Sequence, residues 1–266
     1  MHPYLNIAIE AARKAGALLE RYFQNLDRLQ VEEKAHNDFV SEADRRAEQI
    51  IVDTLHKYYP EHSIIAEEGH GRRTRSEVEW IIDPLDGTTN FLHGFPHFAV
   101  SIACRIKGRL SHGVIYDPIR DELFAASRGE GARMNNVRIR VSEVRHLSHA
   151  LLATGVPYRE FDYVDGYMNS LRYFMMHTAG IRRPGSATLD LAYTACGRVE
   201  GYWELNLRPW DIAAGALIVR EAGGIVTDFA GGDNYLKSGN ILAANPHIIR
   251  EIAKVIAKTI PESQRK

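Results

Sequence analysis

Apolar residues recur at helical spacing near the start of the chain. Leu5, Ala8 and Ala12 fall on one helical face, which predicts an amphipathic helix from residue 3 to about residue 25. A similar pattern that starts near Ser41 predicts a second helix. Further helices are expected over residues 163–178, 187–196, 211–222 and 246–258.

Short apolar runs bounded by turn residues indicate strands, and residues 117–121 have the composition of a hairpin turn. The expected strands cover residues 79–83, 98–106, 112–117, 122–126, 151–154, 201–204 and 224–228. We expect one compact unit with an α+β N-terminal half, residues 1–145, and an α/β C-terminal half, residues 146–266. The pattern alone predicts a mixed α/β fold.

Composition narrows the class of protein. The chain has 266 residues, 45% of them hydrophobic, and a formal net charge of −1, so it can fill a core but has no bulk charge to hold nucleic acid. No basic or aromatic stripe favours direct nucleic-acid binding. Cys104 and Cys196 lie in apolar surroundings and are expected to be buried free thiols. No apolar run approaches the length of a membrane span, so we expect a cytoplasmic protein.

The segment from residue 81 to residue 91 carries the most informative chemistry. Its apolar run reaches Asp83 and Pro84, where the strand is expected to stop because proline fixes its own φ and restricts the residue before it. Asp86, Gly87 and Thr88 follow, and they supply a second carboxylate, a flexible backbone and a hydroxyl. A solvated turn is the alternative interpretation of this composition.

Two other segments also end in acids. Glu67 follows the apolar residues 63–66, and Asp211 follows Trp210. Oxygen ligands without a cysteine or histidine pattern suit Mg²⁺ or Mn²⁺ and disfavour zinc. The basic loop at residues 71–75, between two of these acidic segments, is expected to be solvated.

Two aspartates lie near predicted helix starts. Asp211 begins an apolar helical run, where its carboxylate would lie at the positive end of the helix dipole, as an N-cap would. Asp44 stands three residues after Ser41, which is the spacing of a capping box. Helix capping alone is an alternative role for both residues.

Together these segments resemble the inositol monophosphatase family. The resemblance rests on Glu67-Glu68, on the run from Asp83 to Phe91, and on residues 210–215 followed by residues 221–224. It extends from residue 3 to residue 250, and the opening residues together with residues 96–103 and 207–211 look most like the bacterial SuhB-type branch. The resemblance implies a layered α-β-α-β-α sandwich.

The resemblance also implies roles for individual residues. The first metal would be held by Glu67, Asp83 and the carbonyl of Leu85, and the second by Asp83, Asp86 and Asp211; Glu67 also borders a third position. Two to three Mg²⁺ ions are expected, one bound tightly and at least one arriving with substrate, because the four carboxylates and a phosphate together require that much positive charge. Asp44 and Thr88 would hold the attacking water, with Glu67 counted among the catalytic residues.

On the substrate side, the phosphate is expected to rest on the N–H groups of Gly87 and Thr88. Glu204 matches the family's acceptor for a sugar hydroxyl, and Arg182 falls at a substrate-side position, although an interface or surface role for Arg182 and Arg183 stays open. The residues expected to border the substrate are Leu85, Asp86, Gly87, Thr88, Arg182, Gly185, Ser186, Ala187, Glu204 and Asp211.

The implied reaction is hydrolysis of myo-inositol 1-phosphate, or a similar polyol or sugar monophosphate, by direct attack of a metal-activated water. Relatives that act on fructose 1,6-bisphosphate, NADP or a phosphoadenosine nucleotide share much of the metal set and remain alternatives. The haloacid-dehalogenase type is disfavoured because its acids stand one residue apart near the start of the chain, whereas Asp83 and Asp86 are two residues apart and mid-chain. Residues 129–134 lack the third glycine of a dinucleotide-binding motif.

The partners implied by the resemblance are a phosphomonoester substrate and a second copy of the chain, as a homodimer. Inhibition by Li⁺ at a Mg²⁺ position is a family expectation. SuhB-type proteins also act with Nus factors in transcription antitermination. An interaction protein associated with Nus factors and RNA polymerase is therefore the alternative of a different class.

Overall fold

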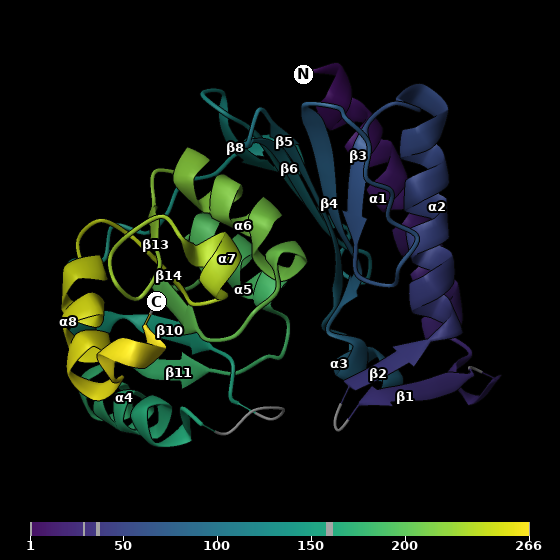
Figure 1. Cartoon of the computed structure of the whole chain (residues 1–266). Helices are drawn as coiled ribbons and strands as arrows, with labels where there is room; N and C mark the ends of the chain where they lie inside the picture. Colours follow the sequence, from purple (N-terminus) through teal and green to yellow (C-terminus); the bar gives the residue numbers. More distant parts are fainter. Residues whose placement is uncertain (1, 29, 36–37, 158–161, 266) are drawn as a thin grey trace.

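Five layers of helices and sheets make up the protein, as Figure 1 shows. The computed structural model describes residues 2–28, 30–35, 38–157 and 162–265. Helices α1 and α2 cover one face of a seven-stranded sheet, and α5 and α6 lie between that sheet and a five-stranded sheet. Helices α4 and α8 cover the far side of the five-stranded sheet. The expected α-β-α-β-α sandwich is confirmed.

The first helical layer is α1 (Pro3–Phe23) with α2 (Glu42–Tyr58). Small residues line the buried side of α1, which lets the helix approach its neighbours closely. A Cβ added at Gly16 would lie only 2.6 Å from the ring of Tyr116 on the sheet. Both predicted helices are confirmed, and the first one ends at Phe23.

The seven-stranded sheet follows chain order from β3 to β9. Strands β3 and β4 are parallel, whereas each later pair is antiparallel. Its strands are β3 (Ser63–Ala66), β4 (Val78–Asp86), β5 (Ala99–Ile106), β6 (Arg109–Asp117), β7 (Glu122–Ser127), β8 (Gly131–Met134) and β9 (Val137–Arg138).

The prediction that β4 stops at Pro84 is wrong, because the strand continues to Asp86. Asp83 pairs with Ser101 and Asp86 pairs with Ala99. Between these two pairs the chain advances by three residues in β4 but by only two in β5. This irregularity is a β-bulge, a place where a sheet tolerates a proline that has no N–H to donate.

The five-stranded sheet has the order β11-β10-β12-β14-β13. Its strands are β10 (Leu151–Thr154), β11 (Gly180–Arg182), β12 (Gly201–Glu204), β13 (Ile225–Thr227) and β14 (Ile241–Ala244), and its helices are α4 (Val164–His177), α5 (Ala187–Ala195), α6 (Pro209–Glu221) and α8 (Ile249–Thr259). Helix α6 is buried over most of its circumference, as its place in the middle layer requires. Because α5 and α6 pack on both large sheets, residues of both halves share one core.

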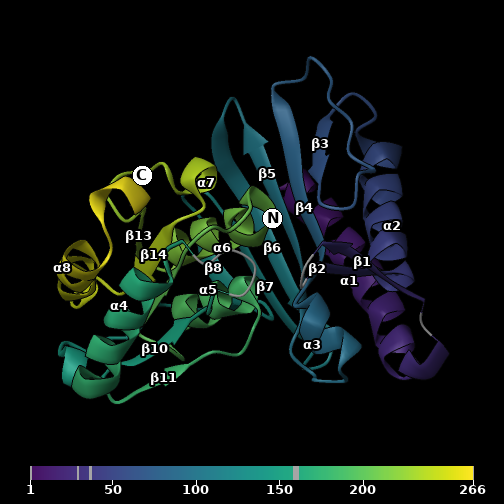
Figure 2. The same cartoon turned by 60° about the horizontal axis from the view of Figure 1, so that its bottom comes forward.

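The remaining elements are short. They are the hairpin β1 (Val31–Ala35) and β2 (Asp38–Ser41), the helices α3 (Thr88–Leu92) and α7 (Tyr235–Ser238), and the 3₁₀ turns Leu26–Arg28, Leu147–His149 and Glu262–Gln264. Figure 2 shows α3 at the lower end of the seven-stranded sheet, close to the hairpin. Within the described ranges, no helix is both long and apolar enough to cross a bilayer.

Candidate active site

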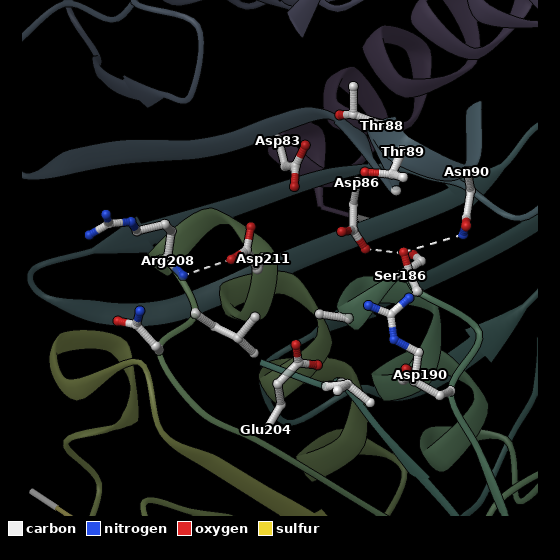
Figure 3. A pocket seen from close by; sticks show the side chains of 18 of the residues that line it. Asp83, Asp86, Thr88, Thr89, Asn90, Ser186, Asp190, Glu204, Arg208 and Asp211 are labelled. Carbon is white, nitrogen blue, oxygen red and sulfur yellow. Dashed lines mark hydrogen bonds between the residues drawn. The ribbon is translucent and has the colours of Figure 1, made fainter. Parts of the chain in front are cut away.

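One cavity of about 460 Å³ gathers most of the residues singled out in the sequence. It lies where the ends of β3 and β4 meet the starts of α5 and α6 and the end of β12 (Figure 3). Of the predicted site residues, it is lined by Glu67, Asp83, Leu85, Asp86, Gly87, Thr88, Gly185, Ser186, Ala187, Glu204 and Asp211. Asp44 and Arg182 are not among its lining residues.

Glu67 and Asp83 are brought together by the parallel register of β3 and β4. Ala66 at the end of β3 pairs with Ile82 in β4, so the residue that follows each of them is an acid, and the two acids are neighbours. Burial raises the pKa of Asp83 well above its usual range, and the negative charges of the neighbouring carboxylates and a hydrogen bond with Glu67 raise it further. Strand pairing therefore places acids where their negative charges repel each other.

Asp86 is held from the opposite half of the chain. Its Oδ2 accepts hydrogen bonds from Ser186 Oγ at 2.5 Å and from the N–H of Thr188 at 2.7 Å. Burial raises the pKa of Asp86, while these hydrogen bonds act in the opposite direction. The hydroxyl of Thr188 donates to the carbonyl of Asp211 at 3.1 Å, which ties the start of α5 to the start of α6.

Asp211 is the third residue of α6, not its N-cap, because the helix begins at Pro209 and Arg208 is the N-cap. Proline suits a first helical position, since its missing N–H has no partner there. Asp211 Oδ2 accepts the N–H of Arg208 at 2.7 Å. The carboxylate still lies in the first turn, at the positive end of the dipole.

Asp44 caps a helix and also contacts Thr88. The N–H of Ser41 donates to Asp44 Oδ2 at 2.9 Å, and the N–H of Ala43 donates to Ser41 Oγ at 3.1 Å, which confirms that Asp44 has a capping role. Thr88 Oγ1 lies 3.1 Å from Asp44 Oδ1 and 3.0 Å from the carbonyl oxygen of Leu85. Burial raises the pKa of Asp44, although its hydrogen bonds oppose the shift.

Gly87 joins β4 to α3 in a left-handed conformation, with φ of 93°. A Cβ there would lie 2.9 Å from the carbonyl oxygen of His97, so the position has neither the conformation nor the space for a larger residue.

Glu204, at the end of β12, occupies the other side of the cavity (Figure 3). Burial raises its pKa to about 7, although the hydroxyl of Tyr202, which donates to Glu204 Oε2, opposes the shift. A Cβ at Gly155 would lie 1.8 Å from Glu204 Oε1, so the carboxylate occupies the space that a side chain at Gly155 would need.

The two adjacent arginines take different positions. Arg183 lines the cavity, whereas the Arg182 side chain is exposed and donates to the carbonyl of Ile181 at 3.1 Å. The substrate-side role of Arg182 stays a prediction.

Several residues that line or brace the cavity were not predicted from the sequence. Asp190 lines it with a buried carboxylate whose pKa is raised well above its usual range, by burial first. Asn90 Nδ2 donates to the carbonyls of His97 and Pro184 at 2.8 and 2.9 Å, which joins the loop after β4 to the loop before α5. The capping pattern at the start of α5 could have pointed to Ser186 as an N-cap, but not to its bond with Asp86.

The lining residues fit a hard divalent cation by their chemistry. In the described part of the chain they offer carboxylate and carbonyl oxygens, and they include no histidine or cysteine. Among the described residues, no three acidic, histidine or cysteine side chains are arranged closely enough to hold a metal ion as they stand. Besides burial, the charges of the neighbouring carboxylates raise the pKa of Asp83, and a cation would neutralise those charges.

Comparisons with known proteins identify the family of the chain. The sequence profile of the inositol monophosphatase family matches residues 1–265. The Nus factor SuhB of Escherichia coli (strain K12) is 53% identical over 251 residues, 94% of each chain. The crystal structure of extragenic suppressor protein suhB from Bartonella henselae has a TM-score of 0.94 at 47% identity, and covers 97% of this chain and 99% of its own. An inositol monophosphatase from Anabaena has a TM-score of 0.83 at 39% identity, with coverage of 98% and 97%. The chain therefore belongs to the inositol monophosphatase family.

Proposed function

We propose that the protein is a Mg²⁺-dependent phosphomonoesterase that hydrolyses myo-inositol 1-phosphate or a closely similar polyol or sugar monophosphate. The observation that carries the proposal is the crowding of carboxylates around Asp83 in a cavity large enough for a small phosphorylated ring. Family membership supports a phosphatase.

Glu67, Asp83 and the carbonyl of Leu85 would hold one metal ion, and Asp83, Asp86 and Asp211 would hold a second. Mn²⁺ suits the same oxygen donors. When bound, the ions supply Lewis acidity that makes water more acidic and stabilises negative charge on the phosphate and on the leaving oxygen.

Thr88 would orient the attacking water. Asp44 Oδ1 and the Leu85 carbonyl both lie within hydrogen-bond distance of Thr88 Oγ1, and a carboxylate and a carbonyl can only accept. The hydroxyl proton of Thr88 is therefore donated to these acceptors. Oγ1 keeps a lone pair that can accept a hydrogen bond from water. A water that donates to Oγ1 keeps its own lone pair for phosphorus.

Asp44 would take up the proton that the water loses, by way of Thr88. The water's proton passes to Thr88 Oγ1 while the Thr88 proton passes to Asp44 Oδ1, so no side chain bonds to phosphorus. A raised pKa makes the Asp44 carboxylate a better proton acceptor than an exposed aspartate.

The rest of the cavity would bind the substrate. The N–H groups of Gly87 and Thr88 would receive the phosphate, and Glu204 would accept a ring hydroxyl. Residues 185–187 would cover the ring beside them.

A phosphatase panel tests the proposal. Phosphate release would be measured from myo-inositol 1-phosphate, fructose 1,6-bisphosphate, NADP and a phosphoadenosine nucleotide, with Mg²⁺ and with EDTA. We expect the highest kcat/KM for inositol 1-phosphate, loss of activity in EDTA, and inhibition by Li⁺ in competition with Mg²⁺. A higher kcat/KM for another substrate would reassign the specificity. If no phosphate is released from any substrate, the proposed phosphatase activity is wrong.

A second role as a Nus factor is proposed from the relatives that carry this name at 53% identity. It would use protein surfaces that bind Nus factors and RNA polymerase rather than the cavity. Tagged wild-type protein and the Asp86→Asn variant would be used to capture these partners. Retention of the partners by an inactive variant supports two separable roles, and their absence with both proteins contradicts the second. The proposed homodimer would be tested by light scattering.

A further inference from the structure

A buried carboxylate outside the cavity holds the loop that carries Glu67. Glu48 lies on α2, and its side chain has 0% exposed area. Its Oε2 accepts the N–H of Glu68 at 2.6 Å, and its Oε1 accepts both the N–H and the ring Nδ1 of His70, each at 2.8 Å.

The geometry of the loop explains why one carboxylate receives two backbone N–H groups. Glu68 and His70 flank Gly69, whose φ of 99° belongs to the left-handed region. This conformation turns the chain so that both N–H groups reach Glu48. Beyond it, Ile64 and Arg72 exchange backbone hydrogen bonds of 2.7 and 2.9 Å, which close the loop back on β3.

Glu67 is therefore fixed on both sides. The residue before it, Ala66, pairs with Ile82 in the sheet, and the peptide after it is bound by Glu48 through the N–H of Glu68. The backbone of Glu67 has little freedom to turn its carboxylate away from Asp83.

Helix α2 serves two parts of the site. Asp44 and Glu48 stand four residues apart and so lie on the same face of the helix, both buried. Asp44 reaches Thr88, and Glu48 reaches the loop after Glu67. One rigid helix thus sets the distance between the proposed water-holding group and a proposed metal ligand.

We propose that Glu48 is a positioning residue that fixes the Glu67 loop and thereby determines how tightly the site binds a divalent cation. The inference rests on the proposed function for its link to catalysis, but the loop contact itself does not depend on it.

The first test measures Mn²⁺ binding by calorimetry, without substrate, in the wild type, Glu48→Gln and Asp53→Asn. The last variant makes the same change of carboxylate to amide at an exposed position of α2 and is the matched control. The amide of Gln would present a donor to at least one of the N–H groups that Glu48 accepts. We expect the dissociation constant for Mn²⁺ to rise about 10- to 100-fold in Glu48→Gln and to be unchanged in Asp53→Asn. Unchanged affinity in folded Glu48→Gln would overturn the proposal.

The second test follows trypsin cleavage of the metal-free protein at Arg72, Arg73 and Arg75, which are exposed directly after the loop. Faster cleavage there in Glu48→Gln than in Asp53→Asn supports the anchoring role, and equal rates contradict it. If Glu48→Gln does not fold, His70→Ala replaces it, because this variant removes one donor and keeps both backbone contacts. We then expect a smaller change in the same direction, and no change overturns the proposal. Failure of the wild type to bind Mn²⁺ would count against the proposed function. The cleavage rates are measured without metal and therefore test the anchoring role of Glu48 independently.

Discussion

Ser186 and Asp86, which are 100 positions apart in the chain, are joined by a hydrogen bond of 2.5 Å from Ser186 Oγ to Asp86 Oδ2. The contact links the end of β4 in the first sheet to the start of α5 in the middle layer. The carboxylate that we assign to the second metal is therefore oriented by the loop that we assign to substrate binding.

Ser186→Ala should weaken this link. Asp86 would lose this donor and keep its hydrogen bonds to Thr188 and Gly87, and a hydrogen bond to a charged group contributes about 1.5–3 kcal/mol. We expect a loss of that size in the free energy of unfolding by urea, with weaker Mn²⁺ binding. Ser170→Ala is the control, because it removes a buried hydroxyl that bonds the carbonyl of Tyr167 within α4. Equal Mn²⁺ affinities in the two variants would contradict the linkage.

Asp83→Asn should stabilise the metal-free protein and inactivate it. The folded-state pKa of Asp83 is raised, so ionisation of this group in the unfolded chain lowers stability as the pH rises above the ordinary aspartate range. A neutral amide removes that loss, and the urea midpoint in EDTA at pH 8 should rise. Phosphate release should fall about 100-fold or more, because Lewis-acid stabilisation contributes several kcal/mol. Near-normal turnover would exclude Asp83 from the metal site.

Thr88→Ala should slow hydrolysis while leaving Mn²⁺ affinity close to the wild type. It removes the hydroxyl that contacts Asp44, and positioned proton transfer contributes roughly 10²- to 10⁴-fold in rate. Thr88→Ser keeps a hydroxyl and should retain most of the rate. A phosphorylated protein trapped with either variant, or an unaffected rate in Thr88→Ala, would refute direct water attack oriented by this residue.

Glu204→Gln should change how stability depends on pH. The pKa of Glu204 rises from 4.5 in the unfolded chain to about 7 in the folded protein, so the unfolded state loses its proton first. The wild type in EDTA should lose stability relative to the variant between about pH 4.5 and pH 7, by at most about 3 kcal/mol, and the difference should stay constant above that range. The exposed substitution Glu130→Gln is the control. Parallel stability curves for wild type and Glu204→Gln would show that burial does not shift this group.

The sequence predicted long elements and isolated motifs better than it predicted contacts. The periodicity of α1 and the capping box of α2 were sufficient to place those helices, because both signals are local. β14 was not predicted, since four consecutive apolar residues have no periodicity that distinguishes a strand from a helix. The predicted N-cap of this helix, Asp211, was three residues too late, because the preference of Pro209 for the helix start was not weighed.

The contacts that complete the site join segments far apart in the chain. Capping chemistry at Ser41 and Asp44 can be read locally, but the reach of Asp44 to Thr88 depends on how α2 lies on the sheet and was expected only from the family resemblance. The same holds for Asn90, whose three neighbouring carbonyl groups come from two loops. Arg183 and Asp190 have no local signal that separates them from ordinary surface and helix residues.

The bulge in β4 determines whether Asp83 and Asp86 point to the same face of the sheet. In a regular strand, residues three positions apart point to opposite faces, so Asp83 and Asp86 would lie on different sides of the sheet. Their partners Ser101 and Ala99 are two positions apart and share a face, which means that the extra residue beside Pro84 restores the two acids to the same side. If the pairing were regular here, with three steps in each strand, Asp86 would point to the opposite face from Asp83. The mismatch of one residue between β4 and β5, as much as the carboxylates, is thus a condition for having a site at all.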